Sequence, residues 1–138
     1  MAPMHSRKRL ALVAHDLQKP AIVAWAKRHR DILERCELWG TGTTGGMVVR
    51  ETGLNVTLLK SGPHGGDLQL GAMITEGRLD ILIFFTDPLT AMPHDVDVKA
   101  LLRISTLNQT VLACNWATAD FVLTSRLFDQ PYEVSHDG

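Results

Sequence analysis

The sequence has few of the features that mark specialised classes of protein. Its two cysteines are too few for a disulfide framework and are typical of a reducing compartment. Lysine plus arginine (14) nearly balance aspartate plus glutamate (15), so the sequence lacks the basic excess of a nucleic-acid-binding domain. The first apolar run, residues 10–14, is too short for a signal-peptide core or a membrane span. We therefore expect a cytoplasmic protein that binds neither nucleic acid nor membrane.

Apolar residues make up 45% of the 138 residues, which is enough for one packed core but not for two ordinary domains. We therefore expect a single domain over residues 1–138. Most of the short apolar runs are nearly continuous rather than alternating, as in strands buried on both faces of a parallel sheet. There are five such runs: 10–14, 36–39, 54–59, 79–85 and 109–114.

The longer stretches between these runs have the spacing of helices. Residues 19–34 place four apolar side chains on one stripe: Ile22, Trp25, Ala26 and Ile32. Residues 43–53 form a short helix candidate that ends at Gly53. In residues 66–77 we expect Leu68, Ala72 and Ile74 to point inward. Strands that alternate with helices predict a doubly wound α/β protein, with helices on both faces of a five-stranded, mostly parallel sheet. The polar tail after residue 129 is expected to be loosely held.

Each apolar run is followed by a polar cluster, and together these clusters predict a ligand site. His15-Asp16, "GTGTTGG" (40–46), "SGPHGGD" (61–67), "TDPLTAMPHD" (86–95) and "NWATAD" (115–120) all come directly after predicted strands. Open α/β sheets bind ligands at the carboxyl ends of their strands. Convergence of five such loops is stronger evidence for a site than any single motif.

The stretch "GTGTTGG" fits G-x-G-x-x-G, the spacing of a dinucleotide-binding turn. That turn usually follows the first strand, with an acid for the ribose after the next strand, but here the next strand leads into Lys60-Ser61. No Gly-Lys-Ser/Thr follows, so it is not a Walker A loop. A helix N-terminus with the hydroxyls of Thr41, Thr43 and Thr44 suits one phosphate group. A plain glycine-rich turn with capping threonines is the alternative.

In the loop "SGPHGGD", Ser61 and Gly62 can offer a hydroxyl and an N–H to another edge of the ligand. Asp67 stands at the predicted start of a helix, where Asp is among the most favourable capping residues. A helix N-terminus also keeps a carboxylate ionised at neutral pH, as a general base requires. The sequence alone leaves both roles for Asp67 open.

Histidines and further acids complete the predicted site. A carboxylate such as Asp95 or Asp97 can fix the tautomer of His94 and leave its other ring nitrogen to act on a ligand. Lys19 is either a solvated helix charge or a phosphate counter-ion. No HExxH or CxxC spacing is present, and hydroxyl-rich loops favour an anion, so we expect no metal.

The five polar blocks together resemble the methylglyoxal synthase family, in order and without large gaps from about Leu10 to Phe128. The runs "DPLTAMPHDVDVKALLR" and "SGPHGGD" are the most specific. The resemblance implies a flavodoxin-like or Rossmann-like sheet, a homohexamer, and a carbon–oxygen lyase that needs no cofactor. Such an enzyme converts glycerone phosphate to methylglyoxal and inorganic phosphate through an enediolate.

The resemblance also implies roles for individual residues. Asp67 matches the catalytic base, and His94, oriented by an acid such as Asp97, would polarise the substrate carbonyl. The positions that match the family's substrate-binding residues and nearby acids are His15, Asp16, Lys19, Thr41, Gly42, Thr43, Thr44, Ser61, Gly62, Asp87 and His94. Some family members have a longer C-terminal segment whose arginine reaches a neighbouring subunit, and this sequence shows no obvious equivalent. The alternative is a non-catalytic effector-binding module of the same fold, as in carbamoyl-phosphate synthetase.

Overall fold

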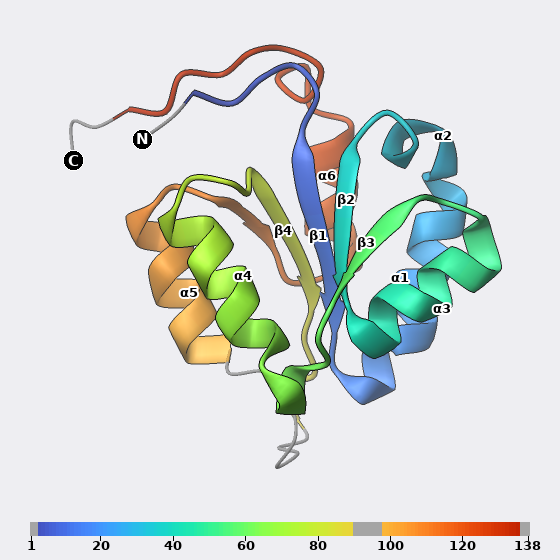
Figure 1. Cartoon of the computed structure of the whole chain (residues 1–138). Helices are drawn as coiled ribbons and strands as arrows, with labels where there is room; N and C mark the ends of the chain where they lie inside the picture. The colour runs from blue at the N-terminus through green and yellow to red at the C-terminus, as the bar shows by residue number, and fades with distance from the viewer. Residues whose placement is uncertain (1–2, 90–97, 136–138) are drawn as a thin grey trace.

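A five-stranded parallel sheet forms the centre of the computed structural model, which describes residues 3–89 and 98–135. The strand order is β3-β2-β1-β4-β5, and every neighbouring pair is parallel. Figure 1 shows this sheet between two layers of helices. The predicted α/β class is therefore confirmed. The strands are β1 (Arg9–Ala14), β2 (Glu37–Thr41), β3 (Val56–Leu59), β4 (Ile81–Phe85) and β5 (Val111–Ala113).

The helices divide between the two faces of the sheet (Figure 1). One face is covered by α1 (Lys19–Arg28), α3 (Gly42–Thr52) and α6 (Trp116–Leu123), and the other by α4 (Gly66–Thr75) and α5 (Val98–Leu107). The predicted helix over residues 19–34 is interrupted at His29, after which the short α2 (Arg30–Leu33) begins. Gly53 ends α3 in the left-handed conformation with φ of 73°, as the sequence predicts.

Burial of the strands follows their place in the sheet. The central strands β1 and β4 are buried on both faces, so their apolar runs are continuous. Strand β3 lies at an edge, and its Thr57 and Leu58 are exposed. The expectation of strands buried on both faces therefore holds in the centre of the sheet and is wrong for β3.

The inward face of α4 differs from the expectation. Leu68 is 76% exposed and Ala72 is also exposed, whereas Leu70, Met73 and Ile74 pack against the sheet. Met73 and Ile74 follow Leu70 by three and four residues, which places all three on one face of the helix. The prediction for Ile74 is confirmed, and the predictions for Leu68 and Ala72 are wrong.

The C-terminal segment is held at the amino edge of the sheet, contrary to expectation. Met4 and Tyr132 form an antiparallel bridge, and Lys8 Nζ donates to the carbonyl of Gln130 at 2.6 Å. Val134 is buried as well. Desolvation lowers the pKa of Lys8. Figure 1 shows both described ends of the chain near each other, at the opposite end of the sheet from the carboxyl ends of the strands. Main-chain pairing therefore holds a segment whose composition alone predicts mobility.

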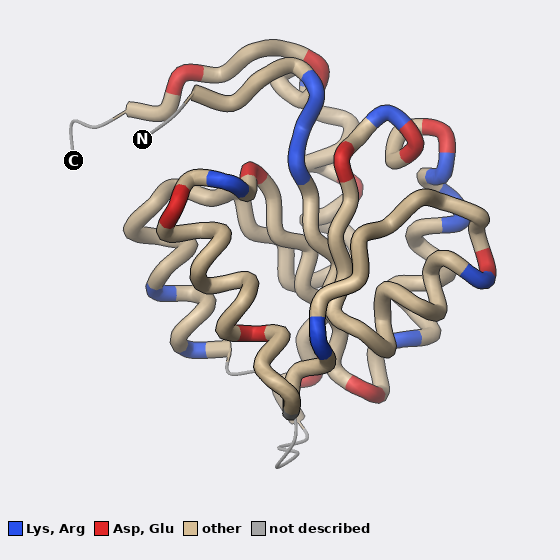
Figure 2. Tube along the Cα trace, viewed as in Figure 1, with Lys and Arg blue, Asp and Glu red and all other residues tan. Residues whose placement is uncertain are grey.

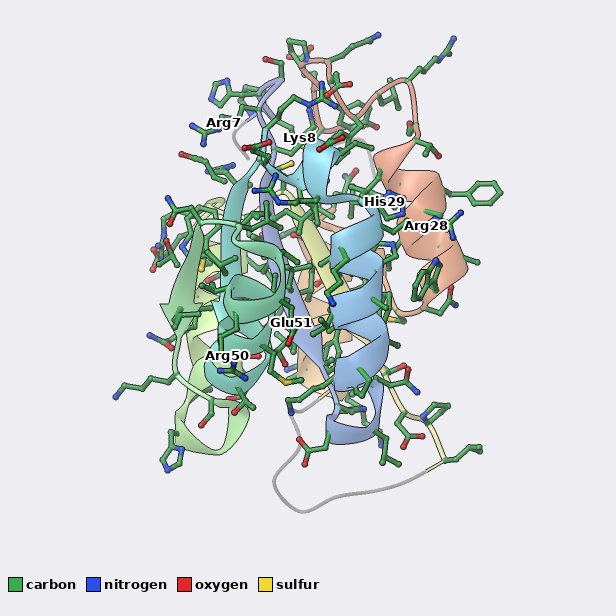
Figure 3. The ribbon with its side chains drawn as sticks, turned by 90° about the vertical axis from the view of Figure 1, so that its right-hand side faces the viewer. Arg7, Lys8, Arg28, His29, Arg50 and Glu51 are labelled. Atoms are coloured by element: carbon green, nitrogen blue, oxygen red, sulfur yellow. The ribbon has the colours of Figure 1, made fainter. Side chains whose placement is uncertain are left out.

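Two polar clusters hold distant parts of the fold together. Asp80 is buried directly before β4, and its carboxylate accepts from the backbone N–H of Arg9 at 2.8 Å and from the Arg9 guanidinium at 2.9 Å. Between α1 and α6, one Asp120 oxygen accepts from the Trp25 indole at 3.1 Å and lies 2.7 Å from His29 Nε2. Figure 3 shows His29 where the end of α1 meets α6.

Charged residues are interspersed along the chain trace (Figure 2). Several pair locally or between neighbouring helices, such as Lys27 of α1 with Glu51 of α3 at 3.2 Å. Within residues 3–89 and 98–135, no helix is both long enough and apolar enough to span a bilayer.

Candidate active site

The carboxyl ends of the parallel strands bring several of the predicted site residues to one edge of the sheet. His15 directly follows β1, Thr41 ends β2, Ser61 comes two residues after β3, and Asp87 two residues after β4. This edge lies at the lower end of the sheet in Figure 1. His94, Asp95 and Asp97 lie outside the described residues. The structure thus places segments that are far apart in sequence around a common edge.

His15 is the most constrained side chain at this edge. It is 7% exposed, and its backbone N–H donates to the Phe85 carbonyl at 3.1 Å. Its ring Nδ1 accepts the backbone N–H of Asp87 at 2.8 Å, and the ring packs edge-on against Phe84 with centroids 5.1 Å apart. Nε2 is buried and has no hydrogen-bond partner among the described residues. Because buried polar atoms are nearly always paired, this nitrogen is available to a ligand or to a water molecule.

Thr44 presents a second buried polar atom without a partner. It is 1% exposed, and its Oγ1 has no hydrogen-bond partner among the described residues. Thr41 is the residue before α3, yet its side chain makes no capping hydrogen bond. The alternative that threonine side chains only cap the helix therefore fails for Thr41. The first turn of α3 also has N–H groups without partners inside the helix, which favours an anion.

Two glycines of "GTGTTGG" serve the packing of α3 against β2. A Cβ on Gly40 would lie 2.7 Å from Gly45 Cα, and a Cβ on Gly45 would lie 2.7 Å from Leu58 Cδ2. Only residues without a side chain permit this approach. The G-x-G-x-x-G spacing is thus explained in part by helix–strand contact.

The loop after β3 lies directly against the threonine loop. The N–H of Gly42 donates to the Lys60 carbonyl at 3.4 Å, and Ser61 Oγ is 2.7 Å from His64 Nδ1. Gly66 donates its N–H to the Ser61 carbonyl at 2.9 Å, and a Cβ at Gly66 would lie only 2.0 Å from the Lys60 oxygen. The loop can therefore adopt this path only with glycine at position 66.

Asp67 is the second residue of α4 and does not cap it. Gly65 is the N-cap residue, with φ of 103°, and no capping side chain is present there. One Asp67 oxygen accepts the N–H of Leu68 at 3.0 Å. The N-cap alternative for Asp67 is therefore wrong, and its carboxylate lies in the first helical turn.

The remaining cation and acids of the site are engaged locally. Lys19 Nζ, which is largely covered, pairs with Asp16 Oδ1. Asp87 offers its N–H to His15, while its carboxylate Oδ1 accepts the N–H of Leu89 at 3.1 Å. Cys114 follows β5, and burial raises the pKa of its thiol. In the part of the chain that the structure describes, no three His, Cys, Asp or Glu side chains are placed to hold a metal ion.

Sequence reasoning missed the residues that support His15. Phe84 and Phe85 read as part of a buried strand, and nothing in their spacing indicates that they also hold the ring and the backbone of His15. Gly66 had a partial signal, since the pair Gly65-Gly66 predicts close backbone approach.

The strand order and the polar edge define the class: a parallel α/β protein whose ligand edge lies at the carboxyl ends of its strands. The model of the MGS-like domain family matches residues 21–113. Methylglyoxal synthase of Leptospira interrogans is 55% identical over 126 residues, which cover 91% of this chain and 85% of that protein. Methylglyoxal synthase of Photorhabdus laumondii is 49% identical over 131 residues, covering 95% and 86%.

A solved structure shows the same likeness in three dimensions. The crystal structure of methylglyoxal synthase from Elizabethkingia anophelis superposes with a TM-score of 0.94 at 44% identity, covering 97% of this chain and 88% of that one. The chain belongs to the methylglyoxal synthase family.

Proposed function

We propose that this protein converts glycerone phosphate to methylglyoxal and inorganic phosphate, without a metal or other cofactor. The observation that carries the proposal is a pair of buried polar atoms, His15 Nε2 and Thr44 Oγ1, which have no partner among the described residues. His15 directly follows β1, and Thr44 lies in the first turn of α3, which follows the adjacent parallel strand β2. Asp67, in the first turn of α4, lies at the same edge of the sheet. A small, polar, oxygen-rich substrate supplies partners for both atoms.

The phosphate group would occupy the threonine loop. The N-terminus of α3 has partial positive charge, and Thr41, Thr43 and Thr44 add hydroxyl groups there. Gly42 in this loop contacts the loop of Ser61 and Gly62 through the Lys60 carbonyl, so both loops can reach one small ligand. Lys19, the first residue of α1, pairs with Asp16 and adds a positively charged group four residues after His15.

Asp67 would act as the general base. Its carboxylate removes a proton from the hydroxymethyl carbon, which lies on the other side of the carbonyl from the phosphate-bearing carbon, and the electron pair of that C–H bond forms an enediolate. His94, oriented by an acid such as Asp97, would donate a hydrogen bond to the carbonyl oxygen and stabilise the negative charge there. The enediolate then expels phosphate by cleavage of the C–O bond, and the resulting enol rearranges to methylglyoxal.

The conformation of the bound phosphate decides between elimination and simple proton exchange. Elimination requires the C–O bond to phosphate to stand perpendicular to the enediolate plane, where the orbitals overlap. A loop that binds the phosphate through several hydrogen-bond donors can hold that conformation. The threonine loop would therefore both bind the substrate and direct its reaction.

We also propose that the protein is a cytoplasmic homohexamer made of single-domain subunits. The support is the family membership together with exposed apolar side chains on three helices: Leu68 of α4 (76%), Leu107 of α5 (72%) and Phe121 of α6 (78%). Interfaces between identical subunits are more apolar than the rest of a protein surface. Light scattering on the purified protein measures the mass, and a monomer at micromolar concentration would contradict the hexamer.

The decisive experiment measures phosphate release from glycerone phosphate, without added metal or nucleotide, by the wild-type protein and by Asp67→Asn. We expect release by the wild type and a loss of at least about 1,000-fold in the variant, because Asn cannot accept the proton. Circular dichroism confirms that the variant is folded. If the wild type binds glycerone phosphate but releases no phosphate, the protein is an effector-binding module and the proposal is wrong.

A further inference from the structure

We propose that Asp87 is a positioning residue that serves the reaction through its peptide N–H, which holds His15 in the tautomer protonated at Nε2. The inference rests on the proposed function and deepens it. It differs from the role that family resemblance implies for Asp87, in which the side chain itself belongs to the substrate site.

The hydrogen bond between the two residues fixes the direction of donation. A peptide N–H is only a donor, so the N–H of Asp87, 2.8 Å from His15 Nδ1, requires a lone pair on Nδ1. A neutral imidazole with a lone pair on Nδ1 has its hydrogen on Nε2. Nε2–H is then a buried donor without a partner among the described residues.

The surroundings of the ring oppose other arrangements. If the ring were rotated by half a turn, a carbon-bound hydrogen would face the Asp87 N–H, and that buried N–H would lose its acceptor. The edge contact with Phe84 and the bond from the His15 N–H to the Phe85 carbonyl also hold the ring and its backbone. All three contacts come from β4 and the residues directly after it, so the end of β4 sets the geometry of His15.

The carboxylate of Asp87 has a different task. Its Oδ1 accepts the N–H of Leu89 at 3.1 Å across Pro88, which forms an Asx-type turn. This turn fixes the backbone of Asp87 and thereby aims its N–H at His15. An Asn side chain can form the same turn without a charge, whereas Ala cannot.

The consequence for the proposed reaction is that His15 acts as a neutral hydrogen-bond donor. Nε2–H would donate to an oxygen of the bound substrate, and His15 would not accept a proton at that atom. This removes His15 from the candidate bases, in line with the proposed role of Asp67, and gives His15 a role in binding and orientation.

Two matched pairs of variants test the inference. Because the turn survives in Asp87→Asn, we expect its kcat/KM to exceed that of Asp87→Ala by roughly 10-fold or more. At position 15, the Gln amide nitrogen reaches the place of Nε2 and the Asn amide does not. We therefore expect His15→Gln to bind substrate roughly 10-fold more tightly than His15→Asn. Thermal unfolding confirms that all four variants are folded.

An independent readout is the tautomer itself, measured by ¹⁵N NMR on the ligand-free protein labelled at histidine, with His15→Gln used to assign the signal. We expect a protonated Nε2 and an unprotonated Nδ1, and a mixture of tautomers in Asp87→Ala. A proton on Nδ1, or equal losses of kcat/KM in Asp87→Asn and Asp87→Ala, would overturn the inference. If the tautomer is as expected but the wild type releases no phosphate, the proposed function fails and the positioning of His15 stands.

Discussion

Gly66 provides the sharpest test of how the fold places the proposed base. A Cβ added at this position would lie 2.0 Å from the Lys60 carbonyl oxygen and 3.0 Å from the Lys60 carbonyl carbon. A carbon atom approaches a carbonyl oxygen to about 3.3 Å, so the two backbone segments must separate by roughly 1.3 Å. Both partners are backbone atoms, which cannot rotate away as a side chain can. Gly66→Ala should therefore displace either the loop of Ser61 or the first turn of α4.

This displacement acts directly on Asp67, the next residue. Misplacing a catalytic group by about 1 Å can lower the rate by ~100-fold, and we expect a loss of that size in kcat/KM. Overpacking of this kind also lowers the free energy of unfolding by about 1–3 kcal/mol. The assay is phosphate release from glycerone phosphate, combined with urea unfolding to obtain the midpoint and its slope.

Gly71 is the matched control, because it lies on the same helix. A Cβ there would meet Ile104 Cδ1 at 3.6 Å, an ordinary contact. Gly71→Ala should keep the wild-type rate and gain up to about 1 kcal/mol in stability, since Ala favours the helix. A Gly66→Ala protein with the unfolding midpoint and kcat/KM of the wild type would show that the clash does not constrain the site.

Two further predictions concern stability. Asp80→Ala leaves the Arg9 guanidinium, 22% exposed in its side chain, without its buried partner, and should cost about 3–5 kcal/mol in urea unfolding; a cost below about 1 kcal/mol would contradict this role. Burial raises the pKa of Cys36 from 9.0 to about 11. The unfolded thiol therefore loses its proton first, so stability should fall as pH rises from 9 to 11, and Cys36→Ala should reduce this decline in pH-dependent thermal melts. An identical decline in both proteins would refute the assignment to Cys36.

Several features of this protein follow from local sequence pattern. The continuous apolar runs of β1 and β4 predict central parallel strands, since only strands buried on both faces need such runs. The left-handed end of α3 at Gly53 is equally local. Once a parallel sheet is predicted, the polar clusters after the strands must gather at one edge. The candidate site could therefore be outlined before any tertiary contact was known.

Tertiary structure decided what the local pattern cannot encode. The His15 ring meets the N–H of Asp87, 72 residues away in sequence, and that contact sets which ring nitrogen faces the site. Whether Asp67 caps its helix depends on the path of the preceding loop, which Gly66 allows by close backbone approach. The tail around Tyr132 is held by Met4 from the other end of the chain. Each of these outcomes depends on contacts between segments distant in sequence, whereas periodicity and motif spacing report only on neighbours along the chain.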